Sequence, residues 1–234
     1  MNKFWIFKNL TDESGMPKGR ALELYGTIAE ESWYDDEITP AMFREELDAG
    51  TDDIVVRINS PGGDCIAASQ IYTMLTEYPG KVTVFVDGLA ASAASVVAMA
   101  GDEIWMAPTA LMMIHNPSTF AWGDHNDMEK AIDVLDEVKE SIINAYELKT
   151  GMQRAKLSRL MEDETWMNAK KAVELGFADR MMNGEKSAEA YAYSAASTVR
   201  SITNKISAKA AEEQKQQGAK VIDKLIALYD RKIQ

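Results

Sequence analysis

Short apolar runs alternate with helical patterns through the middle of the chain. The runs at 54–58 (IVVRI) and 82–86 (VTVFV) are typical of buried strands, and each leads into a glycine-containing turn. Apolar residues at helical spacing follow the first turn over 66–75, and the small residues 90–99 predict a helix after the second turn. Strands that alternate with helices in this way predict an α/β fold with a mainly parallel sheet.

Further elements extend this pattern towards both ends. Two segments, 4–8 and 22–28, predict strands that pair as a hairpin. A helix is predicted from Pro40 to about Leu47, with Thr39 as its N-cap. The remaining predicted strands span 104–106 and 111–114, and the remaining predicted helices span about 127–148, 154–161 and 168–175, the last capped by Asn168.

The charge of the chain is strongly acidic but unevenly placed. The 234 residues carry a net charge of −12, which disfavours a general nucleic-acid binder because phosphates would be repelled. The last fifty residues instead hold nine lysines and arginines against six acids, and their apolar periodicity is weak. We therefore predict a folded domain over residues 1–184 and a basic, partly flexible helical tail over residues 185–234.

Cysteine content and hydropathy bear on the compartment. Cys65 is the one cysteine, so no internal disulfide can form, and no CxxC motif or Cys/His cluster is present to hold zinc. The N-terminus lacks a continuous apolar signal core, and the longest apolar run, 89–100, is too short to span a bilayer. These features predict a protein of the cytoplasm with no membrane partner and no metal.

Two strand-to-helix turns bring candidate chemistry to one edge of the predicted sheet, where ligands bind in such folds. Gly62 and Gly63 let the backbone turn sharply and expose amide N–H groups, although a Pro-Gly-Gly sequence is also an ordinary tight turn. Ser92 lies near the start of an alanine-rich helix. It is either a nucleophile or a small residue that permits close helix packing, and packing is the interpretation for Ser95.

An imidazole base for such a serine has only two sources. His115 follows the predicted strand 111–114 and precedes Asn116, so it faces a loop at a strand end, whereas His125 lies among polar residues in a predicted solvated turn. The acids at 162–164 include candidates to orient the imidazole, and they are equally consistent with solvated charges at a helix end.

Several motifs together resemble the Clp protease proteolytic subunit family of the ClpP/crotonase superfamily. They cover roughly residues 22–182 and occur in the order and spacing of that family: Asn59–Gly63 (NSPGG), Gly88–Ala94 (GLAASAA), Met113–Pro117 (MIHNP) and Ala169–Asp179 (AKKAVELGFAD). The segment 164–166 (ETW) and the basic tail are similar to the phage-encoded members, which look like head-maturation (prohead) proteases. The resemblance implies a ClpP/crotonase-like fold of stacked ββα units.

The resemblance also implies a site and an activity. It implies Ser92 as nucleophile, His115 as general base and Glu164 as the acid, with the amides of Gly63 and Ala93 as oxyanion hole. The family's acid is usually aspartate, so Asp163 is the reserve. Substrate would lie against Gly62, Gly63 and Asn116, and no cofactor is required. The implied assembly is a ring homo-oligomer, with stacked rings through the helix 127–148, acting on polypeptides such as scaffold or capsid proteins.

Three alternatives remain beside the phage-type endopeptidase. One is a housekeeping Clp subunit. Another is a crotonase-like acyl-CoA enzyme, which also uses paired loop amides but does not need serine, histidine and acid together. The third is a catalytically idle ring or capsid-assembly scaffold. Any AAA+ unfoldase must be a separate chain, because the sequence has no GxxxxGK[ST] motif.

Overall fold

The structure is a computed structural model that describes residues 3–11, 17–29 and 40–182. Residue contacts divide the chain into two units, Met1–Asn183 and Gly184–Gln234. Only the first unit contains described residues. The predicted tail at 185–234 and the predicted N-cap Thr39 lie outside them, and the division into a 1–184 domain and a tail stays a prediction.

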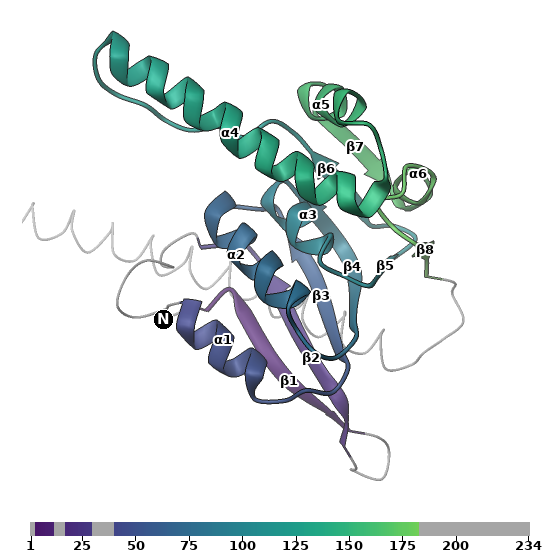
Figure 1. Ribbon diagram of the computed structural model, residues 1–234. Helices are drawn as coiled ribbons and strands as arrows, with labels where there is room; N and C mark the ends of the chain where they lie inside the picture. Colours follow the sequence, from purple (N-terminus) through teal and green to yellow (C-terminus); the bar gives the residue numbers. More distant parts are fainter. Residues whose placement is uncertain (1–2, 12–16, 30–39, 183–234) are drawn as a thin grey trace, which may run out of the picture. The chain divides into compact units, whose positions relative to one another are not determined.

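The described strands form one sheet (Figure 1). Its strands are β1 (Trp5–Thr11), β2 (Pro17–Tyr25), β3 (Ile54–Ser60), β4 (Val82–Ala91), β5 (Glu103–Met106), β6 (Leu111–Ile114), β7 (Thr165–Asn168) and β8 (Arg180–Met181). The order is β1-β2-β3-β4-β5-β8, and β6 pairs with both β4 and β7. Only β1–β2 and β6–β7 pair antiparallel among these strands, which confirms the predicted hairpin and the mainly parallel sheet.

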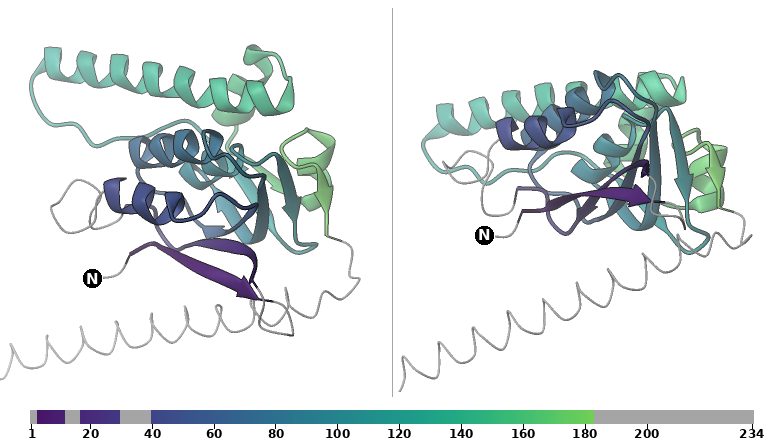
Figure 2. Two further views of the ribbon diagram at one scale, coloured as in Figure 1. Left: turned by 60° about the horizontal axis from the view of Figure 1, so that its bottom comes forward. Right: turned by 90° about the horizontal axis from the view of Figure 1, so that it is seen from below.

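Helices lie along one face of this sheet and beyond its edge (Figures 1 and 2). They are α1 (Pro40–Asp48), α2 (Cys65–Thr76), α3 (Ala93–Ala98), α4 (His125–Thr150), α5 (Arg154–Glu162) and α6 (Ala169–Glu174). The predicted cap of the last is confirmed, because the Asn168 side chain accepts a hydrogen bond from the Lys171 amide. Local capping and apolar spacing therefore predicted most helix positions correctly.

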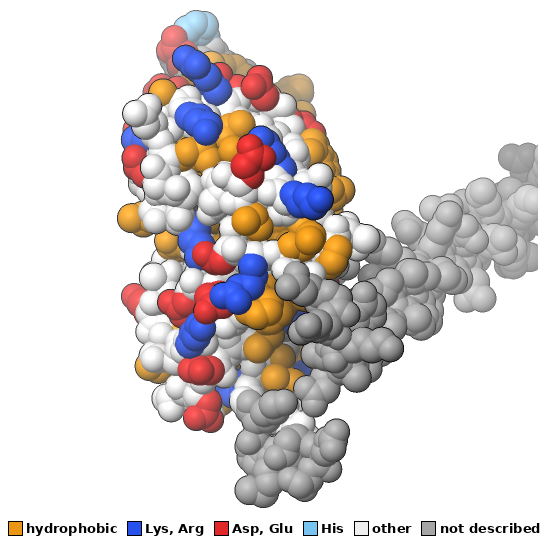
Figure 3. All heavy atoms as spheres, turned by 90° about the vertical axis from the view of Figure 1, so that its right-hand side faces the viewer, with side chains coloured by type: hydrophobic (Ala, Val, Ile, Leu, Met, Phe, Trp, Pro, Cys, Tyr) orange, Lys and Arg blue, Asp and Glu red, His pale blue; other side chains and the backbone are white. Residues whose placement is uncertain are grey.

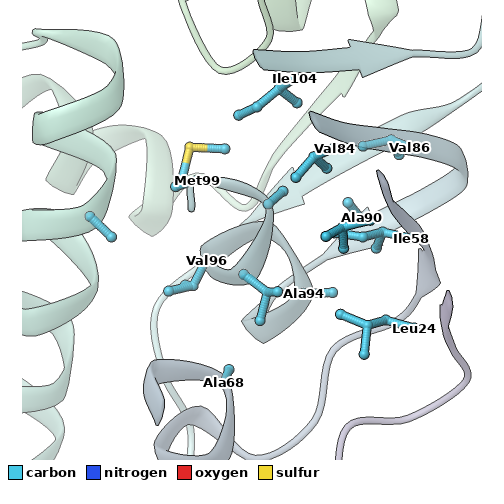
Figure 4. Packing of buried hydrophobic residues seen from close by; sticks show 14 of the residues in the cluster. Leu24, Ile58, Ala68, Val84, Val86, Ala90, Ala94, Val96, Met99 and Ile104 are labelled. Atoms are coloured by element: carbon cyan, nitrogen blue, oxygen red, sulfur yellow. The ribbon is translucent and has the colours of Figure 1, made fainter. Parts of the chain in front are cut away.

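The core lies between α2, α3 and the central strands (Figure 4). Ile58 of β3 and Val84 and Val86 of β4 are fully buried, and they face the small side chains of α3, among them Ala94. Small residues let α3 approach the sheet closely, so that the start of this helix is held in a fixed place by packing.

The predicted helix over 90–99 is wrong in its first part. β4 continues to Ala91, and α3 covers only Ala93–Ala98. The C-terminal part of β4, from Leu89 to Ala91, no longer pairs with β5 and instead pairs in parallel with β6. Hydrogen bonding to β6 thus outweighs the helix propensity of alanine, and the strand-to-helix junction moves to Ser92.

The long helix α4 extends well past the rest of the described unit at its N-terminal end (Figures 1 and 2). It starts at His125, so the predicted turn there is wrong, although His125 is exposed to solvent as predicted. Asp124 caps it, and Asp127 completes a capping box. Its buried residues are confined to 142–146, and Ile132 and Val134 are exposed on the projecting part.

Surface charge in the described unit is mixed. On the face shown in Figure 3, basic and acidic side chains are interspersed with hydrophobic ones. None of the helices within the described ranges is both long enough and apolar enough to cross a membrane.

Candidate active site

Ser92 occupies the junction between β4 and α3 in an unusual backbone conformation. Its φ is 54° and its ψ is −127°, a backbone conformation that residues other than glycine rarely adopt. The Ser92 amide donates to the Met113 carbonyl of β6 at 2.9 Å, which anchors the junction to the neighbouring strand. Strain of this kind persists only where surrounding structure enforces it, and it is typical of functional positions.

His115 lies beside Ser92 because β4 and β6 pair in register. Ala91 is paired with Met113, so the residues just after each strand end are close together. The His115 Nε2 and Ser92 Oγ atoms are 2.7 Å apart, within hydrogen-bond distance. His125 is not part of this pair. It is an exposed residue whose ring nitrogen lies 3.6 Å from the Glu129 carboxylate.

The glycine turn packs directly against this pair. A Cβ at Gly62 would lie 2.7 Å from the Ala91 carbonyl oxygen and 2.8 Å from the Ser92 Cβ, so only glycine fits there. The Gly62 amide donates to the Ser60 hydroxyl at 3.1 Å, and the Gly62 carbonyl accepts from the Ile28 amide at 2.8 Å. Because the peptide is planar and trans, the next amide, that of Gly63, points away from Ile28.

Ala93 supplies the second amide of interest. It is the first residue of α3, where N–H groups have no partner within the helix. The carbonyl oxygen of the same peptide unit belongs to Ser92, and it accepts from the Ser95 amide at 2.9 Å and from the Ser95 hydroxyl at 2.6 Å. The orientation of the Ala93 N–H group is therefore set by the two hydrogen bonds to the carbonyl of the same planar peptide unit.

The acidic candidates lie after α5. Glu164 has a positive φ of 47°, and its exposed carboxylate accepts from the Trp166 indole N–H at 3.1 Å. Asp163 is the exposed C-cap residue of α5. Within the described ranges, neither carboxylate is hydrogen-bonded to His115. The structure thus joins Ser92 and His115 but leaves the third predicted member bound elsewhere.

The strand register nevertheless distinguishes Glu164 from Asp163 as the partner of His115. Ile114 of β6 is paired with Thr165 of β7 in an antiparallel ladder, and the next positions on the two chains are His115 and Glu164. The amides of Asn116 and Glu164 also donate to one carbonyl, that of Met161, each at 3.2 Å. Both relationships put the Glu164 backbone beside that of His115.

Three further residues complete the description of the site. The buried side-chain oxygen of Asn116 has no hydrogen-bond partner in the structure. Ser95, interpreted from sequence as a packing residue, also contacts the Tyr146 hydroxyl at 2.8 Å. Nothing in the sequence marks that contact, because fifty-one positions separate the two residues.

Across 3–11, 17–29 and 40–182, no group of three or more His, Cys, Asp or Glu side chains is arranged to hold a metal ion.

Comparison with known proteins agrees with this geometry. The sequence model of the Clp protease family matches residues 10–185. An ATP-dependent Clp protease proteolytic subunit of Streptococcus pneumoniae (strain 70585) is 30% identical over 173 residues, which are 72% of this chain and 87% of that protein. Subunit 2 of Thermobifida fusca (strain YX) is 30% identical over 154 residues, 63% of this chain and 76% of that protein.

A solved structure shares the fold. A mutant of ClpP1 from Listeria monocytogenes superposes with a TM-score of 0.60 at 21% identity, covering 70% of this chain and 92% of that one. The chain belongs to the Clp protease family. The predicted fold class is confirmed, and peptidase chemistry is the activity of this family.

Proposed function

We propose that this protein is a serine endopeptidase in which Ser92 is the nucleophile and His115 the general base. The observation that carries the proposal is the 2.7 Å contact between Ser92 Oγ and His115 Nε2 at a strained strand-to-helix junction. A packing serine needs neither an imidazole partner nor a positive φ, so both features favour the catalytic interpretation.

The proposed reaction is acyl transfer. His115 Nε2 takes the Ser92 hydroxyl proton as the oxygen attacks a peptide carbonyl, and it later gives that proton to the leaving amine. The amides of Gly63 and Ala93 stabilise the oxyanion, since both belong to backbone that packs around Ser92. Water then hydrolyses the acyl-enzyme. Each step uses only groups of this chain, its substrate and water.

Glu164 is the proposed third member of the triad. Its place opposite His115 in the β6–β7 register supports it over Asp163. For this role the carboxylate must leave the Trp166 indole and turn towards the imidazole. Catalytic hydrogen bonds are often long or absent in unliganded sites and tighten when substrate binds.

Substrate and assembly follow the family. We propose an extended polypeptide that lies beside Gly62, Gly63 and Asn116 and pairs as an added strand. The relatives named above are subunits of ATP-dependent Clp proteases, and we propose for this chain a cytoplasmic ring homo-oligomer, with stacked rings and a separate AAA+ unfoldase as further expectations. A role in phage head maturation rests on the 164–166 segment and the basic tail, and a housekeeping role is the alternative.

A fluorophosphonate probe and an unfolded polypeptide such as casein test the activity. The assembled wild-type protein should be labelled at Ser92 and should cleave casein, and Ser92→Ala and His115→Ala should lose both properties. Ser69→Ala is the matched control, because it removes another half-buried serine hydroxyl, one bonded to the Cys65 carbonyl in α2. Labelling that persists in Ser92→Ala would refute the assignment.

A catalytically idle ring or capsid scaffold is the second candidate. The Glu164–Trp166 contact favours it, since the histidine then lacks a carboxylate partner. Assembled rings with neither labelling nor cleavage would support the scaffold. Cleavage of casein by rings that lack residues 185–234, together with lost cleavage of a phage scaffold protein, would support the head-maturation role.

A further inference from the structure

A buried relay of two hydroxyl groups connects α4 to the nucleophile. Ser95 is fully buried, and Tyr146 is 1% exposed. Their oxygens are 2.8 Å apart, and the Ser95 hydroxyl donates to the Ser92 carbonyl at 2.6 Å. Because the Ser95 proton is used on Ser92, the Tyr146 hydroxyl must be the donor to Ser95.

The tyrosine is held so that its hydroxyl stays protonated and donates to Ser95. Its ring packs edge-on against Phe177, with centroids 5.4 Å apart. Burial raises the pKa of Tyr146, so the hydroxyl keeps its proton throughout the range in which a histidine base operates. The direction of the relay is therefore fixed: Tyr146 to Ser95, and Ser95 to the Ser92 carbonyl.

The end point of the relay is the peptide unit whose N–H group belongs to Ala93. The Ser92 carbonyl and the Ala93 N–H group lie in one rigid plane and point in opposite directions. Two donors on the carbonyl, the amide and the hydroxyl of Ser95, fix the rotation of that plane. They also polarise it, which strengthens the N–H group as a donor.

We infer that Ser95 and Tyr146 are positioning residues that orient the Ala93 amide for the oxyanion. The inference rests on the proposed function, because it concerns the same site. Neither residue touches the substrate. Both act through the Ser92–Ala93 peptide, and their effect should appear in transition-state stabilisation rather than in substrate binding.

The test uses three variants that separate an effect on stability from an effect on rate. Ser95→Ala removes the relay and leaves the Tyr146 hydroxyl buried without a partner, so both the Tm and kcat should fall, kcat by about tenfold or more. Tyr146→Phe keeps the last bond of the relay, and kcat should fall about threefold. The double variant Ser95→Ala/Tyr146→Phe removes both hydroxyls. Its Tm should recover, while its kcat should stay at the Ser95→Ala level.

A second readout measures the oxyanion directly. The affinity of a peptide aldehyde, whose adduct with Ser92 carries an oxyanion, should fall in parallel with kcat across the variants, with KM nearly constant. Tyr78→Phe is the control, because it removes another tyrosine hydroxyl, one that donates to the backbone carbonyls of Gly50 and Asp52. It should leave kcat and aldehyde affinity unchanged.

The outcomes separate this inference from the proposed function. Each protein is measured as particles of wild-type size isolated by gel filtration. If wild type is inactive and Ser92 unlabelled, the proposed function fails and the inference fails with it. If wild type is active and the kcat of the double variant recovers along with its Tm, the residues are merely structural, and the inference alone is overturned.

Discussion

The Glu164 carboxylate accepts a hydrogen bond from the Trp166 indole, at 3.1 Å, instead of one from His115. Glu164 and Trp166 are two positions apart in sequence, and Glu164 lies just beyond the end of the β6–β7 ladder, at the position opposite His115. The indole contact and the histidine contact compete for one carboxylate, so the acid assignment can be tested from both directions.

Removal of the carboxylate charge should separate the two acidic candidates. Glu164→Gln should lower kcat by a factor of about 10² to 10⁴, as loss of the orienting acid does in serine peptidases. Asp163→Asn is the matched control, because Asp163 is a neighbouring exposed acid. It should change kcat by less than about threefold, as is usual for a surface substitution. The reverse pattern would make Asp163 the acid, and no effect from either would indicate a Ser-His dyad.

Removal of the indole donor should have the opposite effect. Trp166→Phe keeps an aromatic ring at this exposed position but frees the Glu164 carboxylate. We expect kcat for a small peptide to stay constant or rise. A fall in kcat as large as that of Glu164→Gln would show that the indole is part of the site rather than a competitor.

Gly62 and Gly26 are two glycines with nearly equal φ angles but different surroundings. Gly62 has φ of 98° and Gly26 has φ of 93°, so alanine is strained at both. A Cβ at Gly62 meets the Ala91 carbonyl and Ser92, whereas a Cβ at Gly26 meets nothing within 4 Å. Gly26→Ala should destabilise the protein by about 1–2 kcal/mol and remain active.

Gly62→Ala adds a steric clash to the same strain. It should displace Ser92 or the glycine turn and abolish casein cleavage and probe labelling, even where the variant still assembles. Urea unfolding and labelling of the two variants check this. Equal activity in both would show that the close approach of Gly62 to Ser92 has no catalytic role.

A largely buried ion pair joins β3 and β4. Arg57 donates to the Asp87 carboxylate, and Tyr25 donates to the same carboxylate at 2.7 Å. Burial raises the pKa of Asp87 despite the attraction of Arg57, so desolvation is the larger effect. Asp87→Asn should leave the Arg57 charge unpaired and cost about 3 kcal/mol in urea unfolding.

The double variant provides the check on that interpretation. Arg57→Met/Asp87→Asn removes the stranded charge, and most of the lost stability should return. A double variant less stable than Asp87→Asn alone would mean that Arg57 stabilises the protein through contacts other than the ion pair, such as its position over the Phe85 ring.

Alkaline pH should weaken the fold through Tyr146. Burial raises the pKa of this tyrosine in the folded state, whereas an unfolded tyrosine ionises near its ordinary pKa of about 10. Below that pH the tyrosine is protonated in both the unfolded and the folded state, and stability does not depend on it. Above it only the unfolded chain loses the proton, so stability falls by up to about 1.4 kcal/mol per pH unit.

The difference between wild type and Tyr146→Phe isolates that contribution. Urea unfolding of both proteins at one concentration, from pH 9 to pH 11.5, should give a steeper decline for wild type by about one proton. Parallel curves would mean that the Tyr146 hydroxyl ionises equally in both states, in conflict with its burial.

The sequence alone predicted most strands of the central sheet, its mainly parallel pairing and His115 as the histidine of the candidate site. Strands such as 54–58 and helix caps such as Asn168 depend on contacts within a few residues, and local patterns record them. His115 could be chosen over His125 because the chain has only two histidines and His115 directly follows a predicted strand. The family motifs then implied Ser92 as the nucleophile, selected Glu164 among the acids at 162–164, and added the Ala93 amide to that of Gly63.

Tertiary structure decided where β4 ends, how Ser92 is strained and what its neighbours contact. The strand extends to Ala91 because β6 offers hydrogen bonds that no local pattern reveals. Two-residue and four-residue strands such as β8 and β7 form for the same reason. The Ser95–Tyr146 contact joins residues far apart in sequence, since α4 packs on α3. Contacts of this kind depend on three-dimensional pairing and packing, which a one-dimensional pattern does not contain.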